Sequence, residues 1–361
     1  MKQTMRSAWF LLALCLSVSR CSTQPARYQT LEVTGMTMGT TYSLQVILDP
    51  PLNRLQLEQQ QNSIRSQAEL ILQKVNRQMS LFKADSELSQ FNAYSGNDWF
   101  PVSAATAFVF EHAIKISRWS GGAFDITVAP LVALWGFGPA PHLQKKPAAE
   151  KIAAALTHIG FDKIQVRPNP PALKKLDAKT KCDLAAIAKG FAVDELSGFL
   201  QQSGYSDFLV EIGGEVHARG KNRQRQPWRV GIDSPQNPGK RIRRMVGLSD
   251  QSLATSGDYR NYFEIAGIRF SHTIDPATGT PIAHSLASIS VVSSTCMDAD
   301  ARATALNVLG PEQGWELAEK ENIPALFIIR TEAGFLEKAT PAFAALVVQR
   351  EIKVDCRLKK K

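Results

Sequence analysis

The sequence has few cysteines, five in 361 residues. Beyond residue 21 they are Cys182, Cys296 and Cys356, an odd number without paired spacing, which indicates neither a disulfide framework nor a zinc site. No internal repeat is present. Basic residues do not form a stripe interleaved with aromatic residues, so we expect no nucleic-acid partner. After the N-terminal region, no apolar run reaches the roughly 20 residues that a membrane span needs.

The composition is that of a folded globular protein. Hydrophobic residues make up 44% of the chain and charged residues 21%, close to globular averages. The length allows one large domain or two smaller ones. The net charge of +9 is partly local, in residues 241–244 and in the tail 357–361. We attribute this charge to solubility or to attraction toward anionic lipid and phosphorylated ligands.

The N-terminus has the pattern of an export signal over residues 1–21. Lys2 and Arg6 precede an apolar run, residues 8–18, that is too short to span a bilayer as an ordinary helix. Cys21 follows at the expected cleavage point, which is typical of a lipid-modified N-terminus. Arg20 fits a lipoprotein signal poorly, so ordinary cleavage nearby stays open. We expect an exported, periplasmic protein, with anchoring to the inner membrane by lipidation at Cys21 as an open alternative.

Hydrophobic periodicity predicts many short strands with helices between them. Apolar residues alternate over 41–48 as in a half-buried strand, and the spacing over 55–78 predicts a long helix. Further helices are predicted from residue 104 to the glycines at 121 and 122, near 151–159, over 183–200 with Asp183 as N-cap, and over 298–310. Further strands are predicted at 207–212, 228–232, 262–266, 288–292 and 325–329. Without regular βαβ alternation, this order indicates an α+β fold with a largely antiparallel sheet, rather than a doubly wound one.

The stretch DADARATAL contains a carboxylate and a hydroxyl at helical spacing. Asp300 and Thr304 are four residues apart, so a helix would project both from one face. Magnesium prefers such oxygen ligands and completes its shell with substrate phosphates. Spacing alone equally fits a helix cap and a surface threonine. The pair is therefore a candidate metal site that needs support from other residues.

Two other segments have candidate ligand-binding residues. In DLAAIAKG, small residues allow a ligand to approach the backbone, and Lys189 offers a charge to a phosphate. A buried Ala-rich helix with an exposed lysine explains that segment equally well. In SHTIDPATGTP, residues 271–281, His272 is a candidate proton acceptor or donor, on a turn shaped by Asp275 and Gly279.

Taken in order, the motifs resemble the FAD:protein FMN transferases, the ApbE-type flavin transferases. The resemblance covers residues from about 36 to 310 and rests on the following stretches: MTMGTTYSL, MSLFKADSELSQFN, SGGAFDITVAPLVALWGFGP, DLAAIAKGFAVDEL, LVEIGGEVHARG, ATSGDYRNY, SHTIDPATGTP and DADARATALNVLG. It implies a single transferase domain over 30–350, followed by a basic tail, 351–361. It also implies Mg²⁺-dependent transfer of FMN from FAD to a threonine hydroxyl of a target protein through a phosphoester, with release of AMP.

The resemblance also assigns residues to the site. For the flavin or nucleotide pocket it implies Met38, Phe82, Ala123, Phe124, Asp125, Asp183, Lys189 and Ile274. For Mg²⁺ it implies the Ala186 carbonyl with Asp300 and Thr304, and Asp298 is an alternative or additional ligand. His272 is then the group that deprotonates the incoming threonine. At Phe82 the family often has tyrosine, so a hydroxyl contact would be lost while ring stacking remains.

Two other functions fit the same residues. Attack by water instead of threonine would make the protein a Mg²⁺-dependent FAD pyrophosphatase that yields FMN and AMP. An exported flavin-binding protein without catalysis would keep the pocket alone. The resemblance favours transfer, with a membrane redox subunit that contains a threonine motif as the acceptor. The sequence around Thr278 also resembles an acceptor motif, which would allow self-modification, but the geometry of the turn explains that sequence more simply.

Overall fold

The structure is a computed structural model. It describes residues 27–139, 146–236, 242–258, 262–265 and 267–348. The predicted export signal with Cys21 and the basic tail 351–361 lie outside the described residues. Within the described part, no helix combines the length and apolar character needed to cross a membrane.

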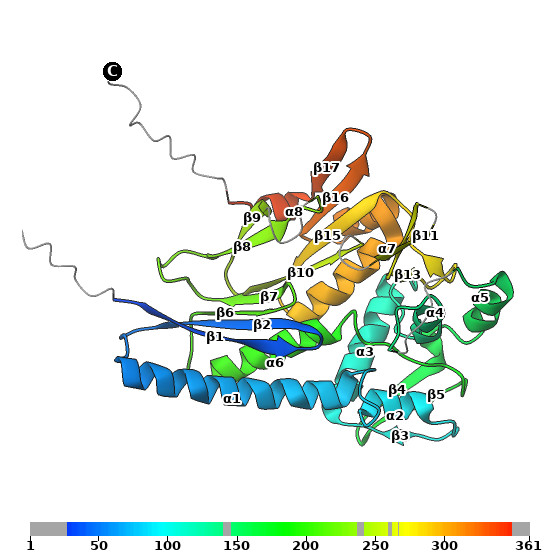
Figure 1. The fold of residues 1–361 in the computed structure, drawn as a ribbon, viewed down its shortest axis with the longest axis horizontal. Coiled ribbons are helices and arrows are strands. Elements are labelled where there is room, and N and C mark those ends of the chain that lie inside the picture. The colour runs from blue at the N-terminus through cyan, green and yellow to red at the C-terminus, as the bar shows by residue number, and fades with distance from the viewer. Residues whose placement is uncertain (1–26, 140–145, 237–241, 259–261, 266, 349–361) are drawn as a thin grey trace, which may run out of the picture.

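An eight-stranded antiparallel sheet forms the centre of the fold (Figure 1). The strands, in spatial order, are β1 (Gln29–Thr37), β2 (Thr40–Leu48), β6 (Phe208–Ile212), β7 (Glu215–Arg219), β10 (Gln251–Gly257), β15 (Leu286–Ser293), β16 (Ala325–Thr331) and β17 (Gly334–Ala339). The predicted α+β class with a largely antiparallel sheet is confirmed. The alternation over 41–48 is confirmed too, because Tyr42, Leu44, Val46 and Leu48 are all buried in β2.

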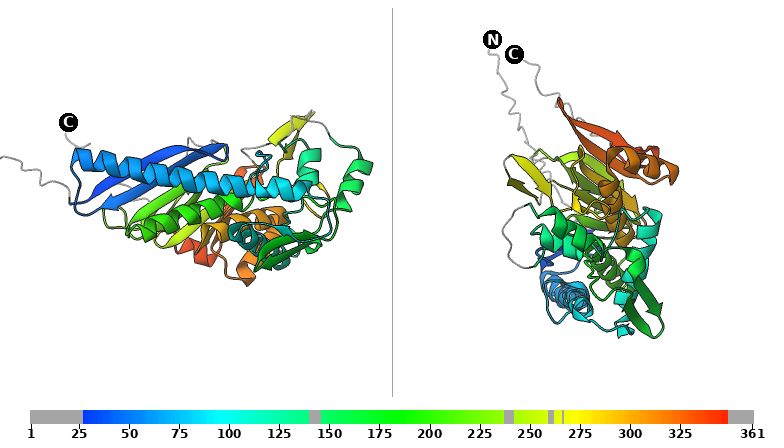
Figure 2. Two further views of the ribbon diagram at one scale, coloured as in Figure 1. Left: turned by 90° about the horizontal axis from the view of Figure 1, so that it is seen from below. Right: turned by 90° about the vertical axis from the view of Figure 1, so that its right-hand side faces the viewer.

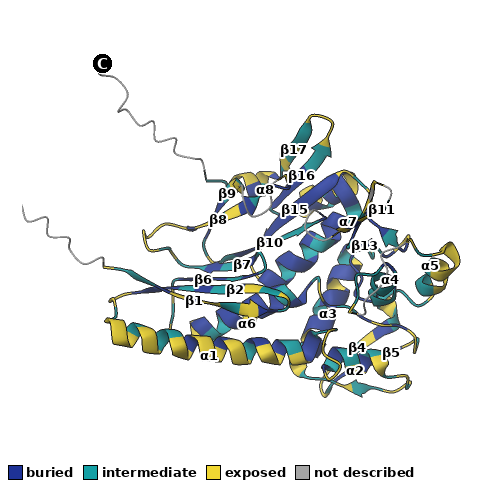
Figure 3. Cartoon of the chain, in the orientation of Figure 1, coloured by how far each residue is buried: buried dark blue, intermediate teal, exposed yellow. Residues whose placement is uncertain are grey.

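Three helices cover one face of this sheet. They are α1 (Arg54–Met79), α6 (Ala188–Gln202) and α7 (Cys296–Lys320). Figure 2 shows α1 running along the outside of the molecule, and Figure 3 shows the alternation of buried and exposed residues on it. Asn53 begins α1 with a capping box, in which its side chain accepts the Gln56 N–H and the Gln56 side chain accepts the Asn53 N–H. The helix predicted over 55–78 is therefore confirmed.

Smaller units flank the sheet and its helices. The ribbon of β8 (Trp228–Asp233) and β9 (Ile242–Leu248), with α8 (Pro341–Ala344), packs on the other face of the sheet. Beside α3 (Ala104–Trp119) lie α2 (Glu87–Ala93), η1 (Phe161–Lys163), β3 (Phe100–Pro101), β4 (Ile164–Pro168) and β5 (Pro171–Lys175). A further unit contains α4 (Ala129–Leu134), α5 (Ala149–Leu156), β11 (Tyr262–Ile265), β12 (Ile268–Ser271), β13 (Ile274–Asp275) and β14 (Thr280–Pro281).

Two predicted helix boundaries differ from the structure. Asp183 is not an N-cap, because α6 begins only at Ala188. The Asp183 N–H instead binds the Ile126 carbonyl at 2.7 Å, and residues 185–187 form a turn before the helix. The helix predicted over 298–310 kinks at Gly310, with φ of 78°, and continues to residue 320. Pro311 follows the kink and lacks the N–H that a regular helix would use there.

Candidate active site

Two cavities meet at the end of the central sheet where α6 and α7 begin. Their volumes are about 390 Å³ and 720 Å³. Five residues line both cavities: Ala185, Lys189, Ser256, His272 and Thr304. We call this set the junction. Except for the alternative ligand Asp298, every residue that the sequence assigned to the site lines at least one of the two cavities, so folding brings together segments that are up to 266 residues apart, from Met38 to Thr304.

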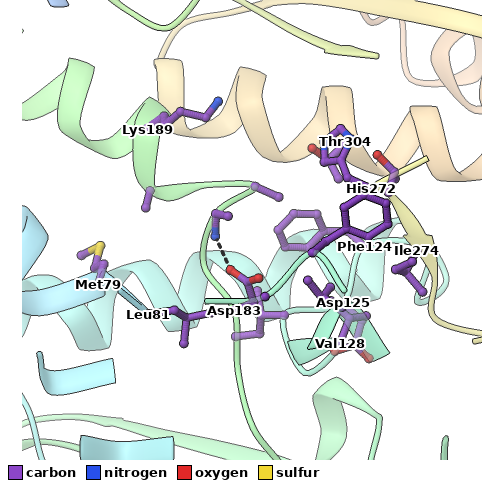
Figure 4. Close-up of a pocket in the computed structure, with 18 of the residues that line it drawn as sticks. Met79, Leu81, Phe124, Asp125, Val128, Asp183, Lys189, His272, Ile274 and Thr304 are labelled. Atoms are coloured by element: carbon purple, nitrogen blue, oxygen red, sulfur yellow. Dashed lines mark hydrogen bonds between the residues drawn. The ribbon is translucent and has the colours of Figure 1, made fainter. Parts of the chain in front are cut away.

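The first cavity is lined mainly by apolar groups. Met38 reaches it from the β1–β2 hairpin, where Met38 and Gly39 have φ of 48° and 73° as in a type I′ turn. Phe82 is 78% exposed and lies at its rim, while Phe124 and Ile274 are buried. Figure 4 shows Phe124 and Asp183 on one side of the cavity, opposite Thr304 and Lys189. Apolar faces of this kind suit a planar ring system.

Asp125 fixes the loop that forms one wall of the first cavity. Its Oδ1 accepts the Thr127 N–H and hydroxyl, both at 2.7 Å, and its Oδ2 accepts the Phe161 N–H at 2.9 Å. Burial raises the pKa of this carboxyl, although these hydrogen bonds lower it. Ala123 belongs to the same loop and lines the cavity beside Phe124. Asp125 therefore holds its neighbours in place through bonds to protein groups.

Asp183 presents a carboxylate on the turn before α6. Its Oδ1 accepts the Ala185 N–H at 2.8 Å, as drawn in Figure 4. Burial raises the pKa of this carboxyl, and the Ala185 N–H partly offsets the effect. The same turn contains Ala186, which also lines the first cavity. The turn therefore places a carboxylate and small residues next to the junction.

A glycine brings α6 and α7 into close contact beneath the junction. A Cβ atom at Gly190 would lie 2.4 Å from the Cys296 carbonyl oxygen, so only glycine fits there without displacing the backbone. The Gly190 N–H donates to Asp300 Oδ2 at 3.1 Å. This bond fixes the orientation of Asp300, which is only 5% exposed. Thr304 follows one turn later on α7 and lines both cavities.

Lys189 lies between two carboxylates. Its Nζ is 2.5 Å from Glu215 Oε1 and 3.9 Å from Asp300 Oδ1. Burial lowers the pKa of Lys189, but the two acids outweigh that effect and leave it raised. Burial raises the pKa of Glu215 to about 7, with Lys189 opposing and Asp300 adding to the shift. The centre therefore holds a lysine that stays charged beside acids that hold protons unusually tightly.

The residues suggested for Mg²⁺ have suitable chemistry. One carboxylate oxygen of Asp300, Oδ2, accepts the Gly190 N–H, and the other, Oδ1, faces Lys189. Thr304 adds a hydroxyl and Ala186 a carbonyl, so all three donors are the oxygens that Mg²⁺ prefers. Among the described residues, no three His, Cys, Asp or Glu side chains form a metal-binding group by themselves. The donor set fits an ion that substrate phosphates complete.

Asp298 is not part of this set. Its Oδ2 accepts from Ser293 at 2.8 Å and from Arg302 at 2.7 Å, and its Oδ1 is 3.3 Å from His112 Nε2. It lines neither cavity. Helical geometry turns residues two apart toward different sides, so these contacts do not favour Asp298 as a ligand beside Asp300, and that alternative stays an untested prediction.

His272 lies in the short link between β12 and β13. It lines both cavities and faces the edge of the Phe137 ring at a centroid distance of 6.3 Å. In Figure 4 it lies next to Thr304 and over Phe124. Trp135 donates to the Gly279 carbonyl at 2.8 Å, which ties the following turn to α4. A base at this point can reach a group bound in either cavity.

Two residues of the centre, Glu215 and Ser256, were not among the predicted site residues. Glu215 is 3% exposed and follows the Gly213–Gly214 turn, where an acid at the start of a buried strand was a usable signal. Ser256, from the stretch ATSGDYRNY, lies in β10, where its Oγ accepts from Asn307 at 3.1 Å. Their position became visible only once the strands had paired.

The fold and the site define an α+β protein in which an apolar cavity and a more polar cavity meet at a charged centre. The family model described as the ApbE family matches residues 38–327. The chain is 40% identical over 344 residues to the FAD:protein FMN transferase of Haemophilus influenzae, covering 94% of this chain and 97% of that protein. The corresponding Escherichia coli K12 protein is 34% identical, with 94% and 97% covered.

Solved structures agree with these relatives. The flavin transferase ApbE from Vibrio cholerae superimposes with a TM-score of 0.79 at 38% identity, covering 89% of this chain and all of that one. The apo form of the Pseudomonas stutzeri flavinyl transferase ApbE gives a TM-score of 0.79 at 36% identity, with 88% and 97% covered. The chain belongs to the ApbE family.

Proposed function

We propose that this protein transfers FMN from FAD to a threonine hydroxyl of an acceptor protein, forming a phosphoester and releasing AMP. The observation that supports this most directly is the junction, where Lys189, His272 and Thr304 line two cavities at once. The pyrophosphate of FAD would lie there, with one of its ring systems in the first cavity. The matched relatives are named FAD:protein FMN transferases, which agrees with transfer of FMN from FAD to a protein.

In this proposal the chain's own residues each have a distinct task. His272 accepts the proton of the incoming threonine as its oxygen forms a bond to the FMN phosphorus and the bond from that phosphorus to the AMP oxygen breaks. Lys189 offsets the negative charge on the phosphates. Asp300, Thr304 and the Ala186 carbonyl would hold Mg²⁺. When bound, Mg²⁺ would polarise the phosphoryl group and stabilise the leaving AMP.

Transfer is tested by incubating the purified protein with FAD, Mg²⁺ and threonine-bearing acceptor domains. We expect a covalent FMN adduct, seen as flavin fluorescence on a denaturing gel and as an added mass, that depends on His272 and is abolished by EDTA. Free FMN and AMP without an adduct would instead indicate a pyrophosphatase. Unchanged FAD with every acceptor would indicate a binding protein.

We further propose that the protein acts outside the cytoplasm on a membrane redox subunit. The support for the location is the pattern of residues 1–21, with Cys21 as the site of a lipid anchor, and the support for the acceptor is the resemblance of the motifs to the flavin transferases. Mass spectrometry of the N-terminus of the mature protein tests this directly. A diacylglyceryl group on Cys21 would establish the anchor, whereas an N-terminus at another residue would show ordinary cleavage.

A further inference from the structure

The second cavity runs along a strand edge. Five successive residues of β8, 229–233, line it. Successive side chains of a strand point to opposite faces. A cavity lined by every residue in turn therefore lies along the edge of the strand, beside its N–H and C=O groups. Residues 255–257 of β10 line it in the same way. The cavity is therefore bounded by backbone on two sides.

The edge of β8 that faces away from β9 has no strand paired with it in the part of the chain that the structure describes. Among the strands that the structure describes, β8 pairs with β9 alone. Gly247 and Met245 of β9 turn their N–H and C=O, respectively, toward residues 346–348, with bonds of 2.9 Å. The residues opposite them, Arg229 and Gly231, must then point their own N–H and C=O groups away from β9. These are the backbone groups that an added strand would bind.

Among the described strands, none pairs with the last residues of β10 on the side of β7, near the junction. Its pairing with β7 ends at Leu253, whereas its pairing with β15 continues to Gly257. Glycines at 213, 214, 231 and 257 line the cavity and leave room for another backbone to approach. Lys189, His272 and Thr304 line the same cavity. An open strand edge thus leads directly to the transfer site.

We propose that the second cavity binds an extended segment of the acceptor polypeptide as an added strand beside β8, which delivers its threonine to the junction. This rests on the proposed function, since it requires a protein acceptor. A ring system needs flat apolar faces, as in the first cavity. A row of outward N–H and C=O groups instead matches the backbone of an extended peptide, and pockets for alternate side chains give the selectivity.

The substitution Arg229→Pro tests whether the edge of β8 binds the acceptor. Arg229→Pro removes an outward N–H that the β8–β9 ladder does not use, and Arg229→Ala removes the same side chain but keeps that N–H. We expect the KM for the acceptor to rise roughly 3- to 10-fold in the proline variant relative to the alanine variant, since one hydrogen bond is lost. The KM for FAD should be equal in the two variants.

N-methylation of acceptor peptides tests which amides of the acceptor backbone bind the edge of β8. The probes are peptides of about ten residues centred on the threonine that the enzyme modifies, each methylated at one successive amide. We expect the KM to rise at every second position only, because alternate amides face β8. Effects without this alternation would overturn the added strand. If Arg229→Pro loses FAD binding through misfolding, the peptide series decides.

The failure of this inference is distinguishable from the failure of the proposed function. If the unaltered protein transfers FMN but shows no alternation and no difference between the two Arg229 variants, only the inference fails. If it transfers FMN to no acceptor, the proposed function fails and the inference fails with it.

Discussion

Lys189 Nζ lies 2.5 Å from Glu215 Oε1 and 3.9 Å from Asp300 Oδ1 at the meeting point of the two cavities. Glu215 is therefore the nearer of the two acidic partners of Lys189, which in the proposed function would face the phosphates. The other oxygen of Glu215, Oε2, is buried, and no hydrogen-bond partner is found for it among the described residues. The position of the Lys189 ammonium group therefore depends on Glu215, an acid that was not among the predicted site residues.

Replacing Glu215 should impair FMN transfer without unfolding the protein. Glu215→Gln keeps the shape of the side chain but loses the ionic bond that directs Lys189. We expect kcat/KM for FAD to fall by roughly 10- to 100-fold, as expected for a misplaced catalytic group. Glu319→Gln, an exposed position on α7, is the control and should behave like the unaltered protein. Equal activity of Glu215→Gln and the control would show that Glu215 does not position Lys189.

The histidine at the junction should matter for the chemical step. In His272→Ala we expect transfer to slow by roughly 10²- to 10⁴-fold, because a general base is lost, while FAD still binds. His158 pairs with Asp177 at 2.6 Å and lines neither cavity, so His158→Ala is a matched control. Single-turnover rates and FAD titrations measure the two effects separately. A normal single-turnover rate in His272→Ala would contradict this role.

Two acids on α7 should differ in their effect on the metal. Asp300→Asn keeps an acceptor for Gly190 but loses the charge, so we expect the Mg²⁺ concentration for half-maximal transfer to rise at least about tenfold. Asp298→Asn is the matched comparison, since Asp298 binds Arg302 and Ser293 instead. Its Mg²⁺ requirement should stay close to that of the unaltered protein. Equal requirements in both variants would remove Asp300 from the metal site.

Two glycines of α6 should tolerate alanine very differently. A Cβ at Gly190 meets the backbone of α7 at 2.4 Å, whereas nothing lies within 4 Å of a Cβ at Gly198. We expect Gly190→Ala to lower the free energy of unfolding by roughly 1–3 kcal/mol through overpacking. Gly198→Ala should raise it by about 0.5–1 kcal/mol through helix propensity. Urea denaturation compares them, and equal effects would contradict the close contact of the helices.

Stability should fall as pH rises through the titration of Asp194. Its carboxylate accepts the N–H groups of Cys296 and Met297, both at 2.8 Å. Burial nevertheless raises the pKa of Asp194 from 3.8 to about 6, so the folded state holds the proton more tightly than the unfolded state. The stabilisation is complete below pH 3.8 and is lost as pH rises toward about 6. Urea midpoints in Asp194→Asn should lack this contribution, and a pH dependence identical to that of the unaltered protein would contradict it.

The sequence by itself determined the elements whose pattern is local. Alternation over β2 and the polar-apolar spacing of α1 follow from burying one face of each element, so both were predicted with nearly correct bounds. The pair Asp300 and Thr304 could be named as well, because four residues on a helix return to the same face. The order of the motifs indicated the family.

Only the tertiary structure decided which groups meet. Asp183 fits an N-cap by sequence, yet a bond from its N–H to Ile126, distant in the chain, holds it in a turn before α6. The sequence alone does not distinguish Asp298 from Asp300. In the folded protein, Asp298 forms an ion pair with Arg302, whereas Asp300 accepts the Gly190 N–H and lines the second cavity. Such contacts depend on how strands and helices pair over long distances, and local patterns do not encode that pairing.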